Sequence, residues 1–181
     1  GDTKLVLFGD GGVGKTSIAL RFCKGVFLTK YDPTVEDVFR QHISVNNQVY
    51  MLEIIDTAGT DQFAIMREMY IKSGQGFILV FSLVSEATFH AIRQYHQQIC
   101  SVKESDYPFV MLVGNKADLQ NERVITKEQA EQLANELKCP YYETSTKENV
   151  NVHMLFEEMV ALIHPQDQNT PKHKSKACLL L

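Results

Sequence analysis

The chain has 181 residues, 44% hydrophobic and 22% charged, which is ordinary for one globular domain that needs no disulfide bonds to be stable. Its net charge is −4, but residues 165–181 carry three lysines against one aspartate, so residues 1–164 carry −6. An acidic body argues against a nucleic-acid partner, and no apolar run approaches the roughly 18 residues that a membrane span requires.

Apolar strands and amphipathic helices alternate along the chain. Residues 4–8 predict a short buried strand, and a glycine-rich turn separates them from a helical pattern over residues 15–24. Asn46 and Asn47 form a dipeptide typical of a hairpin turn between two strands. The other predicted strands are 37–45, 48–55, 76–83, 108–115 and 140–145, and the other predicted helices are about 86–103, 126–137 and 151–163.

This alternation predicts an α/β fold. Apolar strands between amphipathic helices favour a six-stranded, mostly parallel sheet with helices on both faces, in which the hairpin adds one antiparallel strand. Ligands of such sheets bind at the carboxyl ends of the strands, where all the motifs described below lie. We expect residues 1–164 to form this domain and the polar residues 165–181 to form a flexible tail.

The first motif is GDGGVGKT, which lies between a predicted strand and a predicted helix and matches the P-loop pattern. Its glycines let the backbone wrap around phosphates, and the helix points its positive end at the same place. We expect Lys15 to reach the β- and γ-phosphates and the Thr16 hydroxyl to hold Mg²⁺. The pattern predicts the three-layer P-loop NTPase fold. The predicted phosphate-binding residues are Gly11, Gly12, Val13, Gly14, Lys15, Thr16 and Ser17.

The second motif, NKAD, follows a buried strand and contains Asn115, Lys116 and Asp118. The Asp118 carboxylate can accept two parallel hydrogen bonds from N1–H and N2–H of guanine. Adenine lacks both donors and would leave the carboxylate desolvated and unpaired, which is costly. We expect Asn115 to tie this loop to the phosphate loop and the Lys116 stem to cover one face of the base.

Two more segments are predicted to contact the base. ETSTK follows the next strand, and the backbone N–H groups of Ser145, Thr146 and Lys147 can meet the guanine O6. Phe27, which follows the first helix, is predicted to stack on the other face. An ATP-dependent P-loop kinase or ATPase is the alternative, and Asp118 argues against it.

Two loops are predicted to sense the γ-phosphate. In YDPTVED, Thr34 is placed to give Mg²⁺ a second hydroxyl. In DTAG, Asp56 can hold a Mg²⁺-bound water, and Gly59 can donate its N–H to the γ-phosphate. Both loops would be ordered while this phosphate is bound and released when it leaves.

These motifs, in this order and at these intervals, resemble those of the Ras superfamily of small monomeric GTPases over essentially the full chain. Within it, the chain is most similar to the Rap branch, which also carries threonine after DTAG, phenylalanine three residues later and lysine before the switch tyrosine. Thr60, Phe63 and Lys30 are those residues here. The resemblance implies a switch that binds GTP or GDP with Mg²⁺, loaded by a guanine-nucleotide exchange factor and reset by a Rap-type GTPase-activating protein.

The resemblance also implies the roles of the switch residues. Effectors with Ras-binding domains would bind the GTP state through the first switch loop and add a strand at the edge strand. Catalysis would fall to Lys15, Thr34, Gly59 and Thr60. The effector-binding residues would be Tyr31, Asp32, Pro33, Thr34, Val35, Glu36 and Asp37, of which Tyr31 and Thr34 would also contact the nucleotide.

Thr60 stands where Ras-like enzymes carry the glutamine that orients the attacking water. Threonine is shorter and lacks the amide donor and acceptor, so we expect very slow intrinsic hydrolysis and an activating protein that supplies the missing group. The resemblance implies an asparagine from a Rap-type activator. Gln62 is a rival water-positioning residue. Another alternative is a GTP-binding module that does not hydrolyse at a useful rate and is reset by exchange alone.

The sequence ends in CLLL, a C-a-a-X pattern whose final leucine predicts geranylgeranylation of Cys178. One lipid chain anchors only moderately, and Lys172, Lys174 and Lys176 provide a second, electrostatic signal of about 1 kcal/mol each. We therefore expect reversible, salt-sensitive attachment to the cytoplasmic face of the plasma membrane or an endomembrane.

Overall fold

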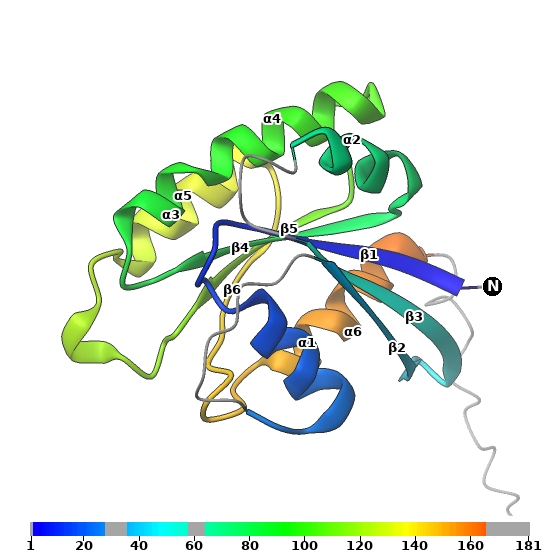
Figure 1. The fold of residues 1–181 in the computed structure, drawn as a ribbon, viewed down its shortest axis with the longest axis horizontal. Helices are drawn as coiled ribbons and strands as arrows, with labels where there is room; N and C mark the ends of the chain where they lie inside the picture. Colours follow the sequence, from blue (N-terminus) through cyan, green and yellow to red (C-terminus); the bar gives the residue numbers. More distant parts are fainter. Residues whose placement is uncertain (1, 28–35, 58–63, 166–181) are drawn as a thin grey trace, which may run out of the picture.

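The computed structural model describes residues 2–27, 36–57 and 64–165, which are built around one six-stranded sheet (Figure 1). The strand order is β2-β3-β1-β4-β5-β6, and only the β2–β3 pair is antiparallel. This arrangement confirms the predicted fold class. The strands are β1 Asp2–Phe8, β2 Glu36–Val45, β3 Gln48–Thr57, β4 Gly76–Ser82, β5 Val110–Asn115 and β6 Tyr141–Glu143.

Helices cover both faces of the sheet: α1 and α6 lie on one face, and α2, α3, α4 and α5 lie on the other (Figure 1). Within the described ranges, no helix combines the length and the apolar character needed to cross a bilayer. The helices are α1 Lys15–Lys24, α2 Ala64–Ser73, α3 Glu86–His90, α4 Ile92–Lys103, α5 Lys127–Leu137 and α6 Val152–Ile163, with a short 3₁₀ turn, η2, at Gln120–Glu122.

The sheet separates two hydrophobic cores. Side chains alternate along β1, so that Leu5 and Leu7 pack against α1 and α6 while Val6 and Phe8 pack against the helices of the other face. Each of these four side chains is at most 1% exposed, and burial of such a side chain contributes roughly 1.5–3 kcal/mol. Both cores hold the strands rigidly, which fixes the positions of the loops at their carboxyl ends.

The predicted hairpin is present between β2 and β3. Asn46 and Asn47 have φ angles of 51° and 65°, the left-handed conformation that a two-residue type I′ turn requires. The turn folds β2 back along β3, so β2 becomes an edge strand of the sheet.

Two helical regions differ from the sequence prediction. The single helix expected over residues 86–103 is two helices, because the chain tightens at Ala91, where the N–H of Gln94 bonds to a carbonyl only three residues earlier. Helix α2 was not predicted. Only Tyr70 and Ile71 of its described side chains are buried, whereas Ile65 and Met69 are exposed, so its apolar residues do not gather on the side that faces the core.

Candidate nucleotide-binding site

The predicted motifs meet at the carboxyl edge of the sheet. The phosphate loop, residues 9–14, connects β1 to α1, and Asp56 lies near the end of β3 directly opposite Leu7 in the β1–β3 register. Asn115 ends β5, and the segment 144–147 follows β6. Because these strands are parallel neighbours, their end loops converge from segments far apart in the sequence.

The phosphate loop packs closely against strands β4 and β5. Gly14 precedes α1 with a φ of 103°, and a Cβ at this position would lie 2.2 Å from Nδ2 of Asn115. A Cβ at Gly9 would lie 2.2 Å from the carbonyl oxygen of Val80 in β4. Only glycine fits at either place, so the loop can approach β4 and β5 closely.

Lys15 is buried inside this loop, with only 6% of its surface exposed. Its Nζ donates hydrogen bonds to the carbonyl oxygens of Gly9 at 2.7 Å and Asp10 at 3.1 Å. Burial lowers the pKa of the Lys15 ammonium to about 8, and the carboxylates of Asp56 and Asp10 oppose this shift. A buried cation held by two neutral carbonyls is well suited to pair with an anionic phosphate.

Thr16 and Asp56 form the candidate Mg²⁺ site. The Thr16 hydroxyl donates a hydrogen bond to Oδ2 of Asp56, which is fully buried. Its other oxygen, Oδ1, is also buried and accepts no hydrogen bond within the described part of the chain. Burial raises the pKa of this carboxyl, against the hydrogen bond from Thr16 and the charge of Lys15. A hydroxyl and a carboxylate with an unsatisfied oxygen fit a hard divalent cation such as Mg²⁺.

Asn115 joins the phosphate loop to both base-reading loops. Its Nδ2 donates to the carbonyl oxygen of Val13 at 3.0 Å, and its Oδ1 accepts from the Thr144 hydroxyl at 2.9 Å. The side chain is 1% exposed, so both bonds are shielded from water. The predicted tie between the NKAD loop and the phosphate loop is therefore present.

Asp118 is held in place by Ser145, whose hydroxyl donates to its Oδ1 at 2.8 Å. Ser145 differs from the prediction in one respect. Its backbone N–H donates to the carbonyl of Val150 at 3.2 Å, so it is engaged in a β-bridge and is not a donor for guanine O6. The N–H groups of Thr146 and Lys147 remain the predicted donors for guanine O6.

The switch residues are only partly described. Glu36 opens the edge strand β2, and the backbone of Asp37 pairs with that of Asp56 across the β2–β3 ladder. Phe27 follows the end of α1, as predicted. The residues with predicted roles that lie outside the described ranges are Lys30, Tyr31, Asp32, Pro33, Thr34, Val35, Gly59, Thr60, Gln62, Phe63, Lys172, Lys174, Lys176 and Cys178.

Three contacts at the site were not predicted from the sequence. Tyr95 of α4 donates its hydroxyl to Oδ1 of Asp10 in the phosphate loop at 2.9 Å, and the Arg67 guanidinium of α2 lies 5.0 Å from the centre of the Tyr95 ring. Arg21 of α1 donates to backbone carbonyls of the ETSTK segment. No local pattern marks such pairs, because 85 and 125 residues separate the partners.

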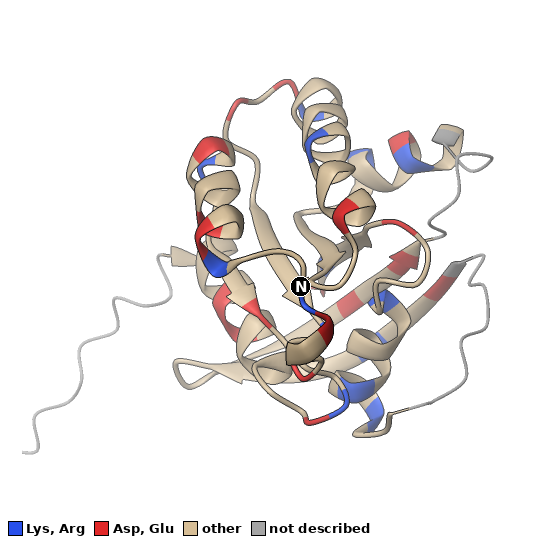
Figure 2. Cartoon of the chain, turned by 90° about the vertical axis from the view of Figure 1, so that its left-hand side faces the viewer, with Lys and Arg blue, Asp and Glu red and all other residues tan. Residues whose placement is uncertain are grey.

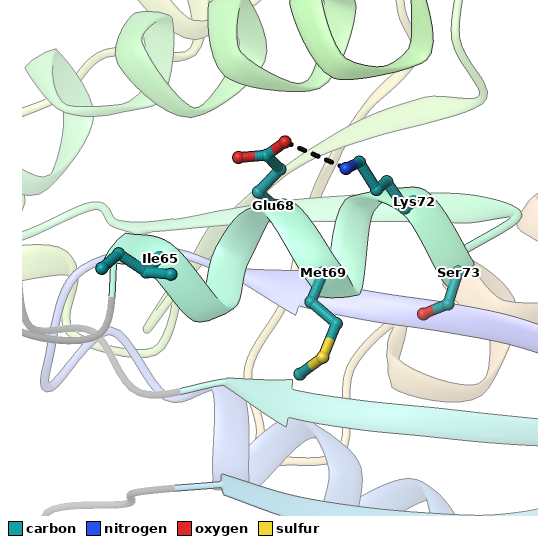
Figure 3. A pocket seen from close by; sticks show the side chains of 5 residues that line it. All are labelled: Ile65, Glu68, Met69, Lys72 and Ser73. Carbon is teal, nitrogen blue, oxygen red and sulfur yellow. Dashed lines mark ion pairs between the residues drawn. The ribbon is translucent and has the colours of Figure 1, made fainter.

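Helix α2, which begins at Ala64, presents exposed apolar side chains. Ile65 is 90% exposed and Met69 is 56% exposed, and they line a hollow of about 570 Å³ (Figure 3). Glu68 and Lys72, joined by an ion pair of 3.1 Å, line the same hollow as Ile65 and Met69 (Figure 3). This pairing of exposed apolar groups with a charged border is typical of a protein-docking surface.

Charges on the described part of the chain are mixed. Figure 2 shows lysine and arginine interspersed with aspartate and glutamate along the helices on both sides of the sheet. No continuous basic face is visible in this view, in keeping with the acidic balance of residues 1–164.

We predict that the affinity for GDP changes little below about pH 8 and falls above it. Phosphates favour the charged form of Lys15, whose pKa is about 8 in the nucleotide-free protein, so binding above that pH must take up a proton. The dissociation constant should then rise by up to about tenfold per pH unit. Calorimetry in two buffers of different ionisation heat measures the affinity and the proton uptake together.

Lys15→Arg is the matched control, because arginine keeps its charge throughout this range and the excess pH dependence should disappear. An equal affinity of the unaltered protein at about pH 7 and pH 9 would contradict the prediction.

The family of the chain follows from its sequence as well as from this geometry. A sequence model of the Ras family matches residues 4–165, which include the phosphate loop, DTAG, NKAD and ETSTK. The matched range contains every strand from β2 to β6 and helices α1 to α6 of the described residues. Members of this family are small GTPases that bind GTP or GDP with Mg²⁺ and act as switches. The chain therefore belongs to the Ras family.

Proposed function

We propose that this protein is a Rap-like, GTP-dependent switch that hydrolyses GTP slowly and depends on an activating protein. The observation that supports the proposal most strongly is the Asn115 amide. It bonds to Val13 of the phosphate loop, 102 residues away, and to Thr144 next to the ETSTK segment. A ligand with phosphates at one end and a base at the other matches the two kinds of loop that this amide joins.

The chemistry assigns one task to each polar group of the site. Lys15 orients and neutralises the β- and γ-phosphates, and its buried position strengthens that interaction. Thr16 and Asp56 would hold Mg²⁺, which when bound neutralises the charge that develops on the transferred phosphoryl group. Asp118 reads the guanine edge and is kept in position by the Ser145 hydroxyl.

Slow hydrolysis follows from Thr60, which lacks the amide that orients water in Ras-like enzymes. An activating protein therefore has to reach the loop that contains Thr60. The apolar surface formed by Ile65 and Met69 begins only five residues further along the chain. We infer that an apolar part of the activating protein binds this surface, with Phe63 as a further contact.

The other partners are proposed from the edge strand and the tail. Effectors with Ras-binding domains would add a strand to β2 near Glu36 and Asp37, because β2 is an edge strand with open backbone groups. Guanine-nucleotide exchange factors would load the switch. Geranylgeranyl on Cys178 and the basic tail, residues 165–181, would anchor the domain of residues 1–164 to the cytoplasmic face of a membrane.

Thr60→Gln should accelerate single-turnover GTP hydrolysis by the protein alone by about tenfold or more, because a well-placed hydrogen-bonding group then orients the attacking water. The rate is measured on protein preloaded with GTP, after Mg²⁺ is added. Gln62→Ala is the control and should change the rate by less than about twofold. An unchanged rate in Thr60→Gln would contradict the water-orienting role, and a large loss in Gln62→Ala would assign that role to Gln62.

Asp118→Asn should shift base preference from guanine to xanthine by on the order of 100-fold, since the amide N–H can donate to the extra carbonyl of xanthine. Competition of GDP and XDP against a fluorescent nucleotide measures this ratio. Asp106→Asn, at an exposed carboxylate between α4 and β5, is the matched control and should keep the original preference. Retained GDP preference in Asp118→Asn would refute the base-reading role of Asp118.

A further inference from the structure

Arg21 lies in the last turn of α1, and its guanidinium donates hydrogen bonds to three backbone carbonyls. Its Nε donates to Thr146 at 2.8 Å, and its two terminal nitrogens donate to Lys147 at 2.9 Å and to Gly25 at 3.1 Å. The first two acceptors are more than 120 residues away in the sequence, whereas Gly25 caps the same helix.

The three acceptors belong to two segments that flank the proposed base site. Thr146 and Lys147 carry the N–H groups expected to bind the guanine O6. Gly25 begins the segment that leads to Phe27, which is expected to stack on the base. Arg21 therefore fastens the base-reading segment to the end of α1, and none of these three acceptors belongs to the phosphate-binding residues.

The chemistry of these bonds requires arginine. Its planar guanidinium presents donors in a fixed fork, so two neighbouring N–H groups can bond to the successive carbonyls of Thr146 and Lys147. A charged donor strengthens each bond. The third bond reaches a carbonyl just beyond the C-terminus of α1, where the helix dipole also favours a positive charge. Lysine, with its single ammonium, cannot reproduce this geometry.

We propose that Arg21 is a positioning residue for nucleotide retention: it latches the segment 144–147 against the end of α1 and thereby slows the release of guanine nucleotide. The inference rests on the proposed guanine site and adds to it a residue that acts on the base-binding loop from behind. Because the latch acts on the base end of the site, it should affect release and leave the chemical step at the γ-phosphate unchanged.

Arg21→Gln tests this inference, because glutamine keeps a polar side chain but loses the positive charge and the guanidinium that donates to three carbonyls. We expect a fluorescent GDP analogue, chased with excess GDP, to leave at least about tenfold faster, which corresponds to about 1.4 kcal/mol. Single-turnover hydrolysis of preloaded GTP should stay within about twofold. General damage to the fold would change both rates, whereas loss of the latch changes only release. Arg21→Lys should not restore slow release.

Arg93→Gln is the matched control. Arg93 of α4 pairs with Glu136 of α5 at 2.7 Å on the surface, so this variant also loses an arginine hydrogen-bond pair but leaves both base-flanking segments intact. Its release rate should equal that of the unaltered protein. Release from Arg21→Gln within about twofold of the unaltered protein, or equal acceleration in both variants, would overturn the inference.

Hydrogen exchange of the nucleotide-free protein separates the latch from the guanine site. Backbone amides of residues 144–148 and 25–27 should exchange faster in Arg21→Gln, while those of β4 stay equally protected. Should Arg21→Gln not fold, Arg21→Lys serves for the same comparison. Failure of the unaltered protein to bind GDP would refute the proposed function. Unchanged exchange at residues 144–148, with GDP bound normally, would refute the latch alone.

Discussion

The buried amide of Asn115 is the interaction on which the arrangement of the site depends. Its Nδ2 donates to the carbonyl oxygen of Val13, and its Oδ1 accepts from the Thr144 hydroxyl, so both ends of the amide are hydrogen-bonded within the protein. The amide nitrogen of Asn115 fits in this position only because Gly14 has no side chain, since a Cβ there would lie 2.2 Å from that nitrogen. A buried polar group that lost one of these partners would cost about 1–3 kcal/mol, so the three loops hold one another in place.

Two buried charges give the phosphate end its character. Lys15 and Asp56 have pKa values that burial shifts in opposite directions, each toward the neutral form. Their mutual attraction opposes both shifts. Phosphate oxygens can balance the positive charge of Lys15. A divalent cation can balance the negative charge of Asp56. The site therefore favours a ligand that brings both charges together, as a magnesium-bound nucleotide does.

Local patterns were sufficient to predict much of this molecule. The strands are short apolar runs, Asn46 and Asn47 mark the hairpin, and the phosphate loop marks the start of α1, so the fold class followed from the sequence. Helix α2 could not be predicted from an apolar pattern because it buries few side chains. The break at Ala91 could not be predicted because that residue keeps a helical backbone, with φ −68° and ψ −20°.

Contacts across the fold could not be predicted in the same way. Arg21 appears in the sequence as an ordinary basic residue near a helix C-terminus, and Tyr95 as an aromatic residue on a core-facing helix. Their partners, Thr146 and Asp10, are brought near only by the packing of the helices on the sheet. The engagement of the Ser145 N–H with Val150 likewise depends on a bridge that no short motif encodes.

The central claim is that this chain holds a complete guanine-nucleotide switch whose hydrolysis is completed by a second protein. Single-turnover hydrolysis of preloaded GTP, measured alone and with Rap-type or Ras-type activating proteins, tests it most directly. The account predicts very slow hydrolysis alone and strong acceleration by the Rap-type activator, which supplies its own water-orienting group. Fast hydrolysis by the protein alone, or acceleration only by the Ras-type activator, would contradict it.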